Sequence, residues 1–176
     1  VIFFRDQNLS AEAHLAFAES FGEPEPPHPF YAHVEGYPQV MVLDFGIHNP
    51  PNTDQWHTDV TFKPDPPFSS ILYSKTIPPV GGDTLWCSTT AAYQALPETI
   101  KSEIRDLRAI HDMNDFRNHY TIGEPDGAAI KLDKAFSNYG SAVHPMVKYH
   151  PVTGKPALYA NPGFTFQVEG LGSAAS

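Results

Sequence analysis

The stretch QWHTDVTF, residues 55–62, places a histidine and an aspartate two positions apart within a run of β-branched and aromatic residues. Such a run is typical of a β-strand, in which residues i and i+2 point to the same face, about 7 Å apart along the backbone. His57 and Asp59 are therefore expected to converge on one point, while Thr58 faces away.

This pair is a candidate metal site. An imidazole nitrogen and a carboxylate oxygen, joined by a second histidine from elsewhere, form the facial triad that holds non-haem iron(II) and leaves open coordination positions. The pair alone is weak evidence, because histidine and aspartate are also common at strand ends and helix caps. Trp56 and Phe62 flank the pair with large apolar groups, and the loop before it is long and polar. These surroundings favour a ligand pair at the mouth of a barrel.

Around this stretch, short apolar runs alternate with proline-rich loops. The chain has 176 residues, 18 of them proline, and proline removes a backbone donor and restricts long helices. Strands are expected over residues 1–4, 40–43, 68–74, 85–87, 108–112 and 164–168, a hairpin over 146–160, and helices over 11–21, 91–96 and 98–107. The pattern predicts a mainly β fold with flanking helices, a sandwich or barrel in a single domain over residues 1–176.

Composition argues against several classes of partner. The formal net charge of −9 disfavours binding to nucleic acid, whose phosphates an acidic surface repels. No run approaches 18 apolar residues, so we expect no membrane span, and residues 1–10 lack the pattern of a secretory signal. The single cysteine, Cys87, precludes an internal disulfide, fits a reducing cytoplasm and is expected to be buried.

Seven sequence units follow one another in a characteristic order. They are FRDQNLS (4–10), FGEPEPPHPFY (21–31), WHTDVTF (56–62), IPPVGGDTLW (77–86), AAYQALP (91–97), LRAIHD (107–112) and HPVTGKPALYANPGFT (150–165). In this order they resemble the TauD/TfdA family of Fe(II)- and 2-oxoglutarate-dependent dioxygenases, and its taurine dioxygenase branch above all. The resemblance implies a double-stranded β-helix, a jelly-roll of the clavaminate synthase-like type, in which His57 and Asp59 bind Fe(II).

The same resemblance implies roles for residues around the metal. Thr84 is expected to hydrogen-bond the carboxylate of the co-substrate 2-oxoglutarate, although without the resemblance it is an ordinary turn residue. His28 and Tyr31 are expected to approach a sulfonate, which suits an imidazole and a phenol as donors. Phe164 and Phe116 are expected to line the substrate cavity, and simple core packing is an alternative for Phe164.

Two departures from the family pattern affect these expectations. Thr53 stands near the substrate where taurine dioxygenase-like members carry asparagine, which leaves room for a related sulfonate or a sulfate ester. The family also needs a distal histidine followed by an arginine that pairs with 2-oxoglutarate, and no arginine follows Arg117 here. We therefore expect the sequence to lack the C-terminal part of the domain, and a short N-terminal part.

The resulting hypothesis is an enzyme that uses Fe(II), 2-oxoglutarate and O2 to hydroxylate the carbon next to a sulfonate or sulfate ester. The products would be sulfite or sulfate with an aldehyde, plus succinate and CO2. Two alternatives stay open: an inactive jelly-roll that only binds ligands, and a TfdA-like oxygenase of a carboxylate. Whether the protein forms a homo-oligomer is left open as well.

Overall fold

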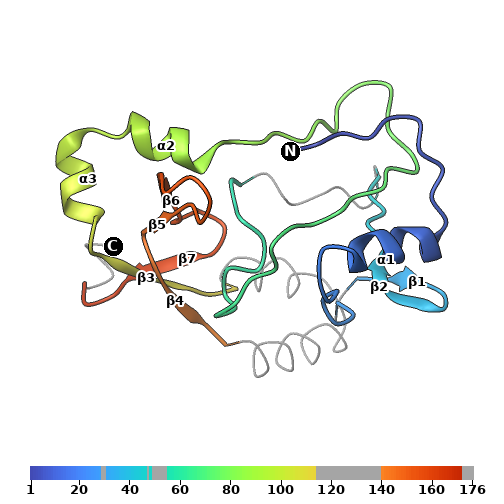
Figure 1. Ribbon diagram of the computed structural model, residues 1–176, viewed down its shortest axis with the longest axis horizontal. Helices are drawn as coiled ribbons and strands as arrows, with labels where there is room; N and C mark the ends of the chain where they lie inside the picture. The colour runs from blue at the N-terminus through green and yellow to red at the C-terminus, as the bar shows by residue number, and fades with distance from the viewer. Residues whose placement is uncertain (29–30, 47, 49–54, 114–139, 172–176) are drawn as a thin grey trace. The chain divides into compact units, whose positions relative to one another are not determined.

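The computed structural model describes residues 1–28, 31–46, 48, 55–113 and 140–171, over which it shows three helices and seven short strands (Figure 1). The chain divides into two compact units. The first comprises Val1–Pro51 and Pro67–Trp86, and the second comprises Asn52–Pro66 and Cys87–Ser176. That these units belong to a single domain stays a prediction.

Over its described residues, the first unit contains one helix and one hairpin. Helix α1, Ala11–Glu19, begins after Ser10, whose hydroxyl accepts a hydrogen bond from the Ala13 N–H at 3.1 Å. This bond satisfies one of the four N–H groups that a helix start leaves free. Strands β1, His33–Val34, and β2, Tyr37–Met41, pair antiparallel, and α1 packs against β2 (Figure 1).

Three predicted strands are wrong, those over residues 1–4, 68–74 and 85–87, because these segments have no regular structure. Side chains in the first of them are 65% to 80% exposed, and Phe3 meets the ring of Trp86 edge-on with centroids 5.5 Å apart. An apolar run supplies side chains for packing, but a strand also needs a backbone partner, which the run itself does not specify. Cys87, expected to be buried, is exposed.

The second unit contains a three-stranded antiparallel sheet in the order β4-β3-β7. Strand β3, Arg108–His111, lies at its centre between β4, Ala142–Pro145, and β7, Thr165–Val168. Because strand side chains alternate between faces, Ala109 and His111 share one face, and both are fully buried. This face carries the core of the unit, and β4 lies outside the strands that the sequence predicts.

The described residues of the second unit also form a hairpin and two helices (Figure 1). Strands β5, Val147–Tyr149, and β6, Pro156–Leu158, pair antiparallel across a turn in which Gly154 has φ +68°, which confirms the predicted hairpin. Helix α2, Thr89–Ala95, packs against β6, and helix α3, Glu98–Ile104, leads into β3. No helix of the described segments has the length and apolarity to cross a lipid bilayer.

The stretch QWHTDVTF ends in a turn and does not form the predicted strand. Residues 59–62 form this turn, in which the Lys63 N–H donates to the Val60 carbonyl at 3.0 Å. Val60 takes φ +52°, a left-handed conformation that ends any extended run. The predicted combination of strands with flanking helices is confirmed, but the sheets of the described segments do not close into a barrel.

The hairpin turn gives a direct test of its backbone requirement. Gly154→Ala is expected to lower the free energy of unfolding by about 1 kcal/mol, because a side chain in the left-handed region is strained. The added Cβ would meet no atom within 4 Å, so the loss reports the backbone alone. Gly154→Asn should lose less, since asparagine tolerates this conformation. Urea denaturation measures both, and an alanine variant as stable as the parent would contradict the assignment.

Candidate metal centre

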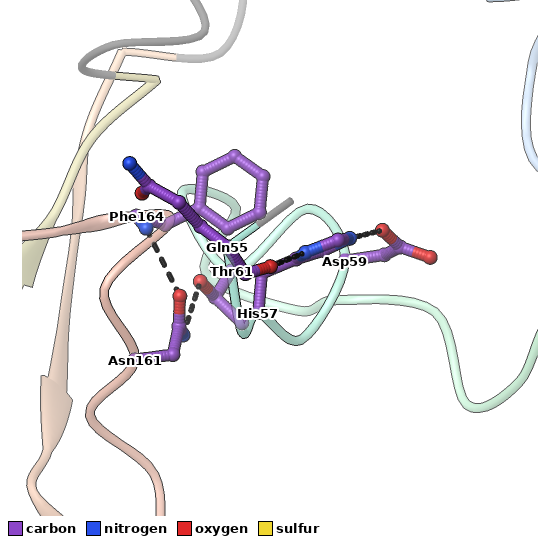
Figure 2. Close-up of polar contacts among 6 residues, drawn as sticks. All are labelled: Gln55, His57, Asp59, Thr61, Asn161 and Phe164. Atoms are coloured by element: carbon purple, nitrogen blue, oxygen red, sulfur yellow. Dashed lines mark hydrogen bonds and ion pairs between the residues drawn. The ribbon is translucent and has the colours of Figure 1, made fainter. Parts of the chain in front are cut away.

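His57 and Asp59 converge, although the turn and not a strand brings them together. The His57 Nε2 atom lies 3.2 Å from the Asp59 Oδ1 atom (Figure 2). On the opposite side of the ring, the His57 Nδ1–H donates to the Gln55 carbonyl at 2.8 Å. A backbone carbonyl that holds one ring nitrogen fixes the tautomer, so the lone pair of Nε2 is directed at the position next to the carboxylate.

The electrostatics of the pair favour a cation. When His57 is protonated, its Nε2–H donates a hydrogen bond to the Asp59 carboxylate, which raises the pKa of His57 above its usual value, while partial burial of the ring opposes this shift. A carboxylate that stabilises a proton on the imidazole stabilises a metal ion in the same position for the same reason. The side chains are 32% and 64% exposed, so the position between them is open to solvent and to ligands.

The pair fits two positions of an octahedral site. Two ligand atoms about 2.1 Å from an ion and at right angles to each other lie about 3 Å apart. The observed 3.2 Å between Nε2 and Oδ1 matches that separation, and a nitrogen with an oxygen is a donor set that Fe(II) accepts. Over the described part of the chain, no three histidine, cysteine or acidic side chains gather closely enough to hold an ion, so the pair is an incomplete triad there.

Buried hydrogen bonds hold the segment that follows Asp59. Thr61 is fully buried, and its Oγ1 atom lies 2.9 Å from His111 Nδ1. The Thr61 carbonyl accepts a hydrogen bond from His144 Nε2 at 2.8 Å, and this nitrogen also lies 3.0 Å from the Lys63 carbonyl. Two side chains of the β4-β3-β7 sheet therefore fix both the side chain and the backbone of a residue two positions from Asp59.

These two histidines are neutral. Burial lowers the pKa of His111 to about 4 and also lowers the pKa of His144, and the positive charge of Lys148 acts in the same direction on both. Their rings meet edge-on with centroids 5.1 Å apart, and both rings contact Tyr159. His111 is therefore a core residue of the sheet that supports this segment.

Phe164 is the predicted substrate-cavity residue that the structure brings to the pair. It is 6% exposed, and its ring stands edge-on to the His57 imidazole with centroids 6.1 Å apart. It also contacts Phe62, with centroids 5.4 Å apart. The ring therefore borders the candidate metal position and belongs to the core, and its role toward a substrate stays a prediction.

The remaining predicted site residues are His28, Tyr31, Thr84, Thr53 and Phe116. His28 and Tyr31 contact each other in the first unit, with ring centroids 4.7 Å apart. Thr84 is an exposed residue of the same unit. Their roles toward the metal pair stay predictions. Thr53 and Phe116 lie outside the described residues.

A model of the taurine catabolism dioxygenase TauD, TfdA family matches residues 1–176. The chain belongs to the TauD/TfdA family. It is 39% identical to an alpha-ketoglutarate-dependent sulfate ester dioxygenase of Pseudomonas putida and 38% identical to an alkylsulfatase of Acinetobacter baylyi. These matches cover 90% of the chain in each case, and 52% and 50% of the two relatives.

A solved taurine dioxygenase from Burkholderia xenovorans has a similar fold, with a TM-score of 0.69 at 34% identity. The match covers 98% of this chain and 53% of that one. The chain thus spans about half the length of the TauD/TfdA relatives that it matches.

Sequence reasoning missed the residues that support the pair, namely Thr61, Asn161 and Gly163. A signal was available for the last two, because an Asn-Pro-Gly unit between two strand-like runs predicts a tight turn. Which segment such a turn would contact is a long-range property, and no local pattern encodes it.

The buried side chain of His111 is expected to make the free energy of unfolding depend on pH. Its pKa is about 4 in the folded chain and about 6.5 when unfolded, so the unfolded state binds more protons between these values. The resulting stabilisation is present above pH 6.5 and is lost as the pH falls toward 4, by up to about 3 kcal/mol. His111→Asn, which cannot titrate, should flatten this pH dependence in urea denaturation.

Replacement of an exposed histidine, His33→Asn, controls for the loss of an imidazole elsewhere in the chain. A His111→Asn variant that loses stability with acid as steeply as the parent would show that His111 is not held neutral.

Proposed function

We propose that the protein is an Fe(II)- and 2-oxoglutarate-dependent dioxygenase that acts on a sulfate ester or a sulfonate. The observation that carries the proposal is the convergence of His57 Nε2 and Asp59 Oδ1 at 3.2 Å, with the imidazole tautomer fixed by the Gln55 carbonyl. Membership of the TauD/TfdA family supports it, as do the names of relatives that act on sulfate esters.

In this proposal the chain supplies two ligands and an environment. His57 and Asp59 hold the iron, which when bound supplies the oxidative chemistry of O2 and the keto acid. The Asp59 carboxylate contributes negative charge to the site, and the Gln55 carbonyl keeps the imidazole in the orientation that binds. Phe164 and Phe62 close one side with apolar surface, which limits the access of water to the reacting position.

In this proposal His28 and Tyr31 would bind the sulfur group of the substrate. His28 and Tyr31 together offer a ring nitrogen and a phenol hydroxyl, which suit the oxygens of a sulfate or sulfonate. Thr84 offers a hydroxyl for the carboxylate of 2-oxoglutarate, and Thr53 and Phe116 would contact the substrate. Hydroxylation of the carbon next to the sulfur group gives an unstable product, which collapses to an aldehyde and releases sulfate or sulfite.

We further propose that the whole protein folds as a jelly-roll that the sheets of this chain help to form. The similarity to a taurine dioxygenase structure across 98% of the chain supports this, since relatives of about twice the length carry the same arrangement. A third ligand would complete the triad from residues other than those described here.

A panel of substrates tests the proposed activity of the whole protein. Anaerobic Fe(II) and 2-oxoglutarate should give a visible charge-transfer band, and addition of O2 with an alkyl sulfate ester or an alkyl sulfonate should release succinate with sulfate or sulfite. Turnover of a phenoxy carboxylate alone would instead indicate an oxygenase of the TfdA type. A protein that turns over none of these would be a ligand-binding module.

Removal of either proposed ligand is expected to reduce turnover. His57→Ala and Asp59→Ala are each expected to lower succinate release by more than the 10- to 100-fold that is typical of outer-shell partners, because a direct metal bond is lost. Asp65→Ala is a matched control, since it removes an exposed carboxylate from the same segment. Retention of the charge-transfer band in both ligand variants would contradict the assignment.

A further inference from the structure

We propose that the turn Asn161–Phe164 is a positioning element for the metal ligands, in which Gly163 sets where His57 lies and Asn161 supports the segment after Asp59. The inference rests on the proposed function, because it concerns the same metal pair. It adds to that function two residues that touch neither the ion nor the substrate but decide whether the ligand atoms converge.

Gly163 lies against the base of the ligand His57. A Cβ added at Gly163 would stand 2.7 Å from the His57 Cβ, closer than side-chain carbons approach one another. The His57 Cβ is bonded to the backbone, so no rotation of the imidazole can relieve such a contact. The Gly163 N–H also donates to the Trp56 carbonyl at 3.3 Å, which joins the turn to the residue just before the ligand.

The requirement at Gly163 is one of space and not of backbone conformation. Its φ is not in the left-handed range that favours glycine, unlike that of Gly154 or Gly81. An alanine there would therefore adopt the native backbone without strain, and its effect would come from displacement of His57. This separates a positioning role from the ordinary role of glycine in turns.

Asn161 holds the turn in shape and connects it to the second ligand. Its Oδ1 atom accepts a hydrogen bond from the Phe164 N–H at 2.9 Å, and its own N–H donates to Thr165 Oγ1 at 2.9 Å. Its Nδ2 lies 3.5 Å from Thr61 Oγ1, two residues beyond Asp59 (Figure 2). The side chain is buried at 9% exposure, so these bonds are made away from water.

The turn is itself anchored to the sheet. The Asp112 N–H, just after β3, donates to the Phe164 carbonyl at 2.8 Å, and β7 begins at the next residue, Thr165. A rigid sheet thus presents the turn to the segment that carries both ligands. The distance between His57 Nε2 and Asp59 Oδ1 is consequently fixed by residues about a hundred positions away in the sequence.

Cobalt(II) binding by the whole protein tests the proposal, with d–d absorption as the readout. Gly163→Ala is expected to weaken Co(II) binding by about 10- to 100-fold, the range for residues that orient metal ligands. Gly46→Ala is the matched control, since its added Cβ meets no atom within 4 Å and its φ is not left-handed. Equal Co(II) affinity in the two variants and the parent would overturn the proposal.

If Gly163→Ala folds poorly, a double-mutant cycle of melting temperatures still tests the proposal. In a His57→Gly background the opposing Cβ is gone, so Gly163→Ala should cause a much smaller drop in melting temperature than it does in the parent. An equal drop in both backgrounds would show that His57 is not what the glycine accommodates.

The same experiments separate this inference from the proposed function. A parent protein that binds no Co(II) would defeat the proposed metal centre, and the double-mutant cycle would still decide whether Gly163 positions His57. A parent that binds Co(II), and loses it on His57→Ala, supports the centre whatever Gly163→Ala does.

Discussion

Two ligand atoms can share one ion only if the backbone between them is held in a single conformation. In this chain that constraint falls on the segment from His57 to Thr61, which passes through the left-handed φ of Val60. Buried hydrogen bonds from His111 and His144 to Thr61 hold the turn where water cannot compete for them. The convergence of the pair and the chemistry proposed for it depend on those bonds.

Histidine side chains serve two opposite purposes near the candidate metal pair. Asp59 raises the pKa of His57, so that ring is placed to take a proton or a metal ion. Burial lowers the pKa of His111 and His144, so those rings stay neutral and add no charge that would repel a cation. Environment, and not residue identity, separates the proposed ligand His57 from the two supporting histidines.

The features that the sequence predicts correctly are those that depend on residues close together in the chain. The helix that begins after Ser10 and the hairpin that turns at Gly154 depend on neighbours within a few positions, whereas the convergence of His57 and Asp59 also depends on bonds from distant strands. The strand expected around the pair was wrong, because tertiary contacts at Thr61 outweigh the β-propensity of its neighbours. The packing of Gly163 on His57 joins distant segments, so no periodicity reveals it. The strands expected over residues 1–4, 68–74 and 85–87 are absent, because an apolar run does not specify its backbone partner.

The central claim is that His57 and Asp59 are ligands of the same ferrous ion. Anomalous diffraction at the iron edge, from crystals of the whole protein grown anaerobically with Fe(II) and 2-oxoglutarate, tests it most directly. The account predicts a single peak about 2.1 Å from both His57 Nε2 and Asp59 Oδ1. A peak bonded to only one of these atoms, or iron bound elsewhere while the two side chains keep their direct hydrogen bond, would contradict it.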